Sequence, residues 1–226
     1  MSNRSEKRFL CSLDCLLQHA KDSEWLDRAA ALLRSQICPV PWKGWVNHST
    51  TVGNGERILA EGFKVYVRPH SFVGKACYFF PGQCCESRSK AQDHAELFYY
   101  EFSPHSNADG VILEGVWETA FLVSTQNGNW TSTADQFLAL VAELLITFHD
   151  AEFPKEQKVF LKEETRYAVP WTLFSTALPE VEGLIIDRMP PTKAGTPQHS
   201  TAIDVMAVFK DCNPSGLTVA RSIPSR

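Results

Sequence analysis

Short apolar segments separated by Pro, Gly and Asn turn signals run through most of this chain, and they constrain its fold more than any other feature. Segments of this kind are typical of β-strands. They show no βαβ rhythm, and the sequence contains no glycine-rich phosphate loop. We therefore predict an α+β protein. The predicted strands are 44–51, 63–69, 74–80, 96–103, 109–117, 119–125, 157–161, 165–175 and 183–189, with an added edge strand at 202–209.

Apolar residues at helical spacing predict a smaller number of helices. Residues 5–35 carry one or two helices, because their apolar side chains repeat on one face. Residues 53–62 form a short helix, which Gly62 ends in the position preferred for a C-terminal cap. The strongest helical pattern lies at 133–150, where apolar residues run almost all round, so we expect this helix to be well buried.

Length and composition fit one globular domain with terminal extensions. A chain of 226 residues with 44% apolar residues can bury a sizeable core. We expect a helical N-terminal segment at 1–40 and the main α+β domain at 41–212. The final residues, 213–226, are expected to form a flexible tail.

Charge, cysteine spacing and hydropathy exclude several classes of protein. The net charge of −4 and the lack of a basic run argue against bulk nucleic-acid binding. Seven cysteines without a C-x-x-C pair argue against a zinc site or a disulfide scaffold, so we expect no metal and reduced thiols. No signal peptide or membrane-spanning segment is visible, which predicts an intracellular protein, cytoplasmic or nuclear, with no membrane partner.

Three short motifs follow one another between residues 44 and 100. His48-Ser49-Thr50 ends a predicted strand, Ile58-Leu59-Ala60-Glu61-Gly62-Phe63 ends a predicted helix, and Gly74-Lys75-Ala76-Cys77-Tyr78-Phe79 lies on the next strand. In type, order and spacing these motifs resemble the catalytic core of the ADP-ribosyltransferases of the poly(ADP-ribose) polymerase and diphtheria-toxin type. The resemblance implies a split β-sheet core with flanking helices, and it implies NAD as the substrate.

The resemblance also implies roles for individual residues. His48 would bond the adenosine-side ribose, the backbone at Ser49 would bond the nicotinamide carboxamide, and Tyr78 would stack on the nicotinamide ring. Thr50 and Gly74 belong to the same NAD-binding motifs, and Ser87 or Ser89 would supply a second bond to the carboxamide.

The family also places a glutamate at the start of a late strand, where it supports the positive centre that forms as the glycosidic bond breaks. Glu164 is the first choice for this role, with Glu163 beside it. Glu118 and Glu182 are alternatives, because each precedes a predicted strand.

The resemblance implies transfer of ADP-ribose, as a single unit, from NAD to an acceptor with release of nicotinamide. The acceptor could be a protein, a nucleic acid, a small molecule or water. Ser49 and Ala76 replace glycines of the family pattern, and side chains there would narrow the nicotinamide slot. The alternative is therefore a catalytically inactive module that binds NAD, ADP-ribose or a protein. In a third interpretation His48 and Tyr78 are structural residues that point to different faces of the sheet.

Overall fold

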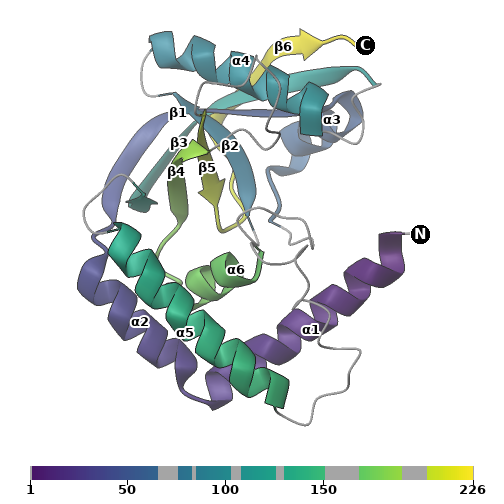
Figure 1. The fold of residues 1–226 in the computed structure, drawn as a ribbon. Helices are drawn as coiled ribbons and strands as arrows, with labels where there is room; N and C mark the ends of the chain where they lie inside the picture. Colours follow the sequence, from purple (N-terminus) through teal and green to yellow (C-terminus); the bar gives the residue numbers. More distant parts are fainter. Residues whose placement is uncertain are drawn as a thin grey trace, which may run out of the picture. The chain divides into compact units, whose positions relative to one another are not determined.

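The computed structural model describes residues 2–65, 76–82, 85–102, 108–125, 130–150, 168–189 and 203–225, which contain six helices and six strands (Figure 1). The helices are α1 (Ser2–Asp22), α2 (Trp25–Gln36), α3 (Val52–Glu61), α4 (Cys85–Phe102), α5 (Trp130–Asp150) and α6 (Ala168–Ala177). The strands are β1 (Val40–Thr51), β2 (Cys77–Gly82), β3 (Gly110–Ser124), β4 (Gly183–Met189), β5 (Ile203–Val208) and β6 (Ser215–Ile223). The α+β class predicted from the sequence is confirmed.

The chain divides into two compact units. The helical unit contains α1, α2, α5 and α6, and the barrel unit contains α3, α4 and the six strands. The four helices of the helical unit come from two separate stretches of sequence, because β1, β2 and β3 lie between α2 and α5 along the chain. The sequence-based division at residues 40 and 212 therefore misses this arrangement, since periodicity within a segment does not reveal which distant segment it packs against.

Five strands of the barrel unit form a closed circuit in the order β1-β2-β5-β4-β3, and β3 pairs back to β1. All pairings in the circuit are antiparallel except β3 with β4. The sixth strand, β6, pairs antiparallel with residues 110–116 of β3, whereas β4 pairs with residues 122–124 of β3. Successive side chains of a strand point to opposite faces, so one set fills the barrel. The interior cluster is Trp42, Val46, Phe63, Cys77, Phe79, Val111, Leu113, Trp117, Leu122, Met206 and Val208.

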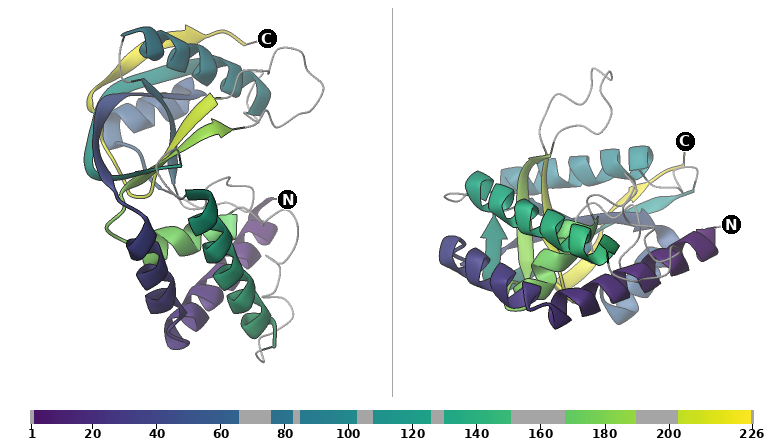
Figure 2. Two further views of the ribbon diagram at one scale, coloured as in Figure 1. Left: turned by 60° about the vertical axis from the view of Figure 1, so that its left-hand side comes forward. Right: turned by 60° about the horizontal axis from the view of Figure 1, so that its bottom comes forward.

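The outer face of β1, β2 and β3 is covered by α4 (Figure 2). Ala91, Ala95 and Tyr99 recur at four-residue spacing on this helix, so they lie on one face and are buried. They pack in a second apolar cluster with Phe80 of β2 and Ile112 of β3. The barrel is therefore filled on its inside and clad by a helix on this part of its outside.

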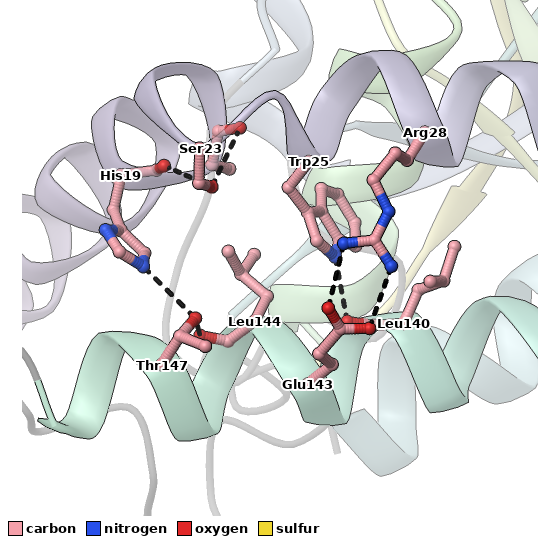
Figure 3. Close-up of polar contacts among 9 residues, drawn as sticks. His19, Ser23, Trp25, Arg28, Leu140, Glu143, Leu144 and Thr147 are labelled. Atoms are coloured by element: carbon pink, nitrogen blue, oxygen red, sulfur yellow. Dashed lines mark hydrogen bonds and ion pairs between the residues drawn. The ribbon is translucent and has the colours of Figure 1, made fainter.

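The helical unit packs around Trp25, which begins α2 and is 2% exposed. Its indole Nε1 donates a hydrogen bond of 2.8 Å to the carbonyl oxygen of Leu140 in α5 (Figure 3). The ring also lies 6.0 Å from that of Phe137, centroid to centroid. Nearby, Arg28 forms a bidentate ion pair with Glu143 at the surface. These contacts bind α2 to α5 across a long separation in the sequence.

Several elements differ from the prediction. The predicted strand 96–103 falls largely in α4, and 165–175 falls largely in α6, as far as these residues are described. Tyr, Phe, Val and Thr favour strands, but burial on one helical face decides the outcome here. The predicted strands 109–117 and 119–125 are one continuous strand, β3. The predicted strand 157–161 and most of 63–69 lie outside the described residues.

Three further predictions are corrected by the structure. Residues 215–223 of the predicted flexible tail form β6, because β3 offers its edge to them. The predicted edge strand at 202–209 is β5, which is paired on both sides, with β2 and β4. The helix α5 is buried on one face only, since Leu138 and Ile146 are 49% and 63% exposed. No described helix has the length and apolar character needed to cross a membrane.

Replacing Trp25 by alanine should destabilise the helical unit strongly. The change removes a buried indole together with its hydrogen bond to the Leu140 carbonyl, a loss of about 3–5 kcal/mol in the free energy of unfolding. Arg28→Ala is the matched control on the same helix, and its effect should be small because the ion pair is exposed. Urea unfolding followed by tryptophan fluorescence and circular dichroism measures both; equal effects would contradict the packing role of Trp25.

Candidate functional site

The three motifs of the sequence lie on consecutive elements of the barrel unit. His48 lies on β1, the helical motif ends α3, and Tyr78 lies on β2. Thr51 caps α3 by accepting a hydrogen bond of 3.4 Å from the backbone N–H of Asn54. Gly62 follows the helix with φ of 75°, as predicted for a C-terminal glycine. Strands β1 and β2 are antiparallel neighbours, so the His48 and Tyr78 positions are close in space.

His48 faces the inside of the barrel, on the same side of β1 as Val46. Its ring contacts Phe63 and Phe79 in edge-to-face geometry, with centroid distances of 5.1 and 6.0 Å. The ring Nδ1 lies 2.8 Å from the backbone oxygen of Tyr78, so Nδ1–H is the donor. Burial lowers the pKa of His48, and the bond to the Tyr78 carbonyl opposes that effect only in part. The imidazole is therefore held neutral at pH 7, among aromatic rings.

Tyr78 projects from the opposite face of the sheet. Its neighbours Cys77 and Phe79 belong to the interior cluster, and Phe80 belongs to the cluster under α4. Tyr78 is half-buried and packs against that second cluster. The sheet thus separates the two side chains that the resemblance places around one NAD molecule. This is the arrangement that the structural interpretation of His48 and Tyr78 predicts.

The described glutamate candidates lie elsewhere on the barrel. Glu118 is exposed and forms a 2.7 Å ion pair with Lys43. Glu182 precedes β4, where it accepts a hydrogen bond of 2.6 Å from the Thr119 hydroxyl and pairs with Lys210. Burial raises the pKa of the Glu182 carboxyl, but the bonds from Lys210 and Thr119 outweigh it and lower the pKa below its ordinary value.

Other predicted residues divide between the two faces and the undescribed parts of the chain. Glu164, its neighbour Glu163 and Gly74 lie outside the described residues. Ser49 and Thr50 are half-buried near the end of β1, and by strand alternation they project to opposite faces. Ser87 and Ser89 lie in the early turns of α4, and Ser89 lines the hollow described next.

An open polar hollow lies between the early turns of α4 and strand β6. It encloses about 440 Å³. Its walls come from three elements, namely α4, β3 and β6. The lining residues are Arg88, Ser89, Gln92, Glu114, Thr218, Val219 and Ala220.

Gly82 allows α4 to approach the sheet closely at this point. A Cβ atom at Gly82 would lie 2.8 Å from the Cα of Arg88, which is closer than real contacts allow. Gly82 is also the register partner of Trp45 on β1. The guanidinium of Arg88 consequently stacks over the Trp45 ring, 4.1 Å from its centroid.

The floor of the hollow is the carboxylate of Glu114, which is only 3% exposed. Arg88 binds both its oxygens, with Nε 2.6 Å from Oε2 and Nη2 on Oε1. Gln92 donates a further hydrogen bond of 2.7 Å to Oε2. Two residues one turn apart on α4 thus hold a buried carboxylate of β3, which fixes its orientation toward the hollow.

Asn47 is the register partner of Glu114 and is fully buried. Its Nδ2 donates a long hydrogen bond of 3.4 Å to the carbonyl oxygen of Phe80. Its Oδ1 accepts no hydrogen bond from the residues that the structure describes. A buried amide oxygen without a donor is energetically costly. The Asn47 Oδ1 atom is therefore an unused hydrogen-bond acceptor next to Glu114 in the sheet.

Glu114, Arg88 and Gln92 are site residues that the sequence reasoning missed. The available signal was an acidic residue inside the apolar run VILEGV, since a charged side chain in the middle of a buried strand needs a partner. Arg88 and Gln92 gave no such signal, because a polar helix start is common at any protein surface. In the described parts of the chain, no group of His, Cys, Asp and Glu residues is placed to hold a metal ion.

The chain matches no protein-family model, and it matches none of the curated proteins significantly.

The ion pair of Glu114 with Arg88 should contribute measurably to stability. Glu114→Gln keeps the volume but removes the charge that Arg88 binds, which costs about 2 kcal/mol in the free energy of unfolding. Glu118→Gln on the same strand is the matched control, and its exposed ion pair should have a much smaller effect. Urea unfolding measures the free energy of unfolding of both variants. Equal losses would show that the buried ion pair of Glu114 contributes no more to stability than the exposed ion pair of Glu118.

His48 should make the barrel unit less stable as the solution becomes acidic. Its pKa in the folded state is below the ordinary value near 6.5, so the unfolded chain binds a proton that the folded chain rejects. The free energy of unfolding is therefore highest at pH values above the ordinary pKa of histidine. It decreases as the pH falls toward the folded-state pKa of His48.

The comparison of wild type with His48→Gln, by denaturant unfolding at pH values of about 7.5 and 5.5, measures this contribution. The wild type should lose more stability over this interval than the variant. His94→Gln is run in parallel, because burial also lowers the pKa of His94. Identical pH dependence in wild type and His48→Gln would show that His48 titrates alike in both states.

Proposed function

We propose that the barrel unit binds NAD or ADP-ribose in the hollow over Glu114 and acts as a binding module rather than a transferase. The observation that carries this proposal is the buried carboxylate of Glu114, held by Arg88 and Gln92 at the floor of an open polar hollow. Carboxylates of this kind accept hydrogen bonds from the hydroxyl groups of a ribose. The volume of about 440 Å³ lies in the range of small-ligand sites.

The chemistry of the lining fits a ribonucleotide better than an apolar ligand. Glu114 and Ser89 can form hydrogen bonds with the hydroxyl groups of a ligand, and the planar guanidinium of Arg88 is suited to bind a phosphate group. Thr218 on β6 is the register partner of Glu114, so its side chain lies beside the carboxylate on the same face of the sheet. Tyr78 and Ser89 lie on this same side of the sheet, so two of the residues implied by the resemblance favour this face.

Catalysis by the arrangement implied from the sequence is disfavoured by the geometry. His48 lies in the barrel interior against Phe63 and Phe79, whereas Tyr78 lies under α4. The resemblance requires one NAD molecule to contact both side chains, which here lie on opposite faces of the sheet. The described candidates Glu118 and Glu182 are paired with lysines away from either residue.

Calorimetric titration of the full-length chain with NAD, ADP-ribose and nicotinamide tests the proposal. NAD and ADP-ribose should bind and nicotinamide alone should not. Thr218→Trp, which fills the hollow from an exposed position, should weaken binding at least about tenfold, and Glu114→Gln should do the same. Glu118→Gln should bind as the wild type does. Absence of binding at about millimolar ligand, or unchanged binding by Thr218→Trp, would overturn the proposal.

NAD-dependent transfer of ADP-ribose to an acceptor is the second candidate. The direct pairing of β1 with β2, and the hydrogen bond from His48 to the Tyr78 backbone, favour it because they hold the two motifs together. Nicotinamide release in the same samples separates the candidates. Release that disappears in His48→Ala and Tyr78→Ala would replace the binding module by a transferase. Glu164→Gln would then test the predicted glutamate.

A further inference from the structure

The helix α5 carries apolar side chains on two opposite faces. One face packs against α1, α2 and α6, and its buried residues are Thr133, Phe137, Val141, Leu144 and Phe148. Figure 3 shows Leu144 and Thr147 on this side, pointing toward α1 and α2. The other face carries Leu138 and Ile146, whose side chains are large and apolar although these residues are 49% and 63% exposed.

The apolar residues of the second face form one row along the helix. Ala139 and Ala142 are exposed like Leu138 and Ile146, and Leu145 is half-buried. Residues at spacings of three and four lie on the same side of a helix, so these five side chains are neighbours. A single exposed apolar residue is common on any protein surface, but a row of this kind is typical of a helix that contacts another helix. We call these five residues the outer stripe.

The outer stripe is complementary to itself when two copies of α5 lie antiparallel and cross at Ala142. Leu138 is four residues before Ala142 and Ile146 is four residues after it, so each lies opposite the other in the second copy. Ala139 and Leu145 are three residues before and after Ala142, which matches a small side chain with a large one. The crossing point joins two alanines, and small side chains at a crossing allow two helices to approach closely.

The polar residues at the ends of the outer stripe are complementary in the same arrangement. Asp135 is seven residues before Ala142 and His149 is seven residues after it, and both are exposed. The Asp135 carboxylate therefore lies beside the His149 imidazole of the second copy. An imidazole N–H donates to a carboxylate in either protonation state. Near the crossing point, Glu143 is already paired with Arg28 of its own chain, which reduces repulsion between the two copies of Glu143.

We propose that two copies of this chain associate through the outer stripes of α5, antiparallel and related by a twofold axis at Ala142. A twofold contact uses the same surface on both copies, so it gives a dimer rather than a filament. One helix pair is at the small end of the range for specific interfaces, and the dimer should therefore dissociate at micromolar concentrations. The proposal is independent of the hollow over Glu114, because it rests on residues of the helical unit alone.

Sedimentation equilibrium of the full-length chain, at about 1 to 500 μM, tests the proposal. The mean mass should rise with concentration from that of one chain toward that of two. Ile146→Glu places a charge in the outer stripe and should weaken association at least about tenfold. Leu59→Glu is the matched control, because Leu59 is a 41% exposed leucine on α3, and it should associate as the wild type does. A one-chain mass at every concentration, or equal association of Ile146→Glu and wild type, would overturn the proposal.

An exchange of charges tests the antiparallel register and guards against a variant that merely misfolds. Asp135→Lys should weaken association, because it removes the carboxylate that lies beside His149 of the second copy. Adding His149→Glu to Asp135→Lys should restore association, since the two charges are then exchanged. Circular dichroism checks that both variants keep the helical content of the wild type. A double variant that associates no better than Asp135→Lys alone would overturn the proposed register.

Discussion

The antiparallel pairing of β1 with β3 holds the barrel unit together. The register runs from Val40 opposite Leu122 to Thr51 opposite Gly110, so nearly the whole of β1 is matched. The other edge of β1 binds β2, and the other edge of β3 binds β6 along one part and β4 along another. Each strand of the circuit is therefore reached from this pair, directly or through one neighbour.

This register also decides which side chains meet. His48 opposite Leu113 points into the barrel, whereas Asn47 opposite Glu114 points toward α4. A slip of one residue would exchange the two sets, bringing a carboxylate into an apolar interior. The buried ion pair with Arg88 thus supports the register as well as the hollow, since it is available only when Glu114 faces the helix. The polar contacts on the α4 side of the sheet therefore depend on the alternation of side chains between the two faces along β1 and β3.

Much of the local structure could be predicted from the sequence, because it is set by neighbouring residues. The strand before His48, the helix ended by Gly62 and the α+β class all follow from short-range patterns. The pattern around Tyr99 and that in α6 gave the wrong element, because strand-favouring aromatic and β-branched residues there pack on a helical face.

The site could be predicted only in part. The order of motifs placed His48 and Tyr78 on neighbouring strands, but the face that each side chain occupies depends on pairing and on the position of α4. Glu114 needed knowledge of two partners on α4, and no local sequence pattern links that helix to the middle of β3. A motif defines neighbours along the chain, and the sheet then assigns them to one side or the other.

The divided origin of the helical unit has a consequence for synthesis of the chain. Trp25 emerges from the ribosome 115 residues before Leu140, the residue whose carbonyl it binds. At about 5–20 residues per second, the apolar face of α2 waits roughly ten seconds for α5. The barrel strands β1, β2 and β3 are made during that interval. A nascent chain at this stage offers chaperones an amphipathic helix pair without its native partner.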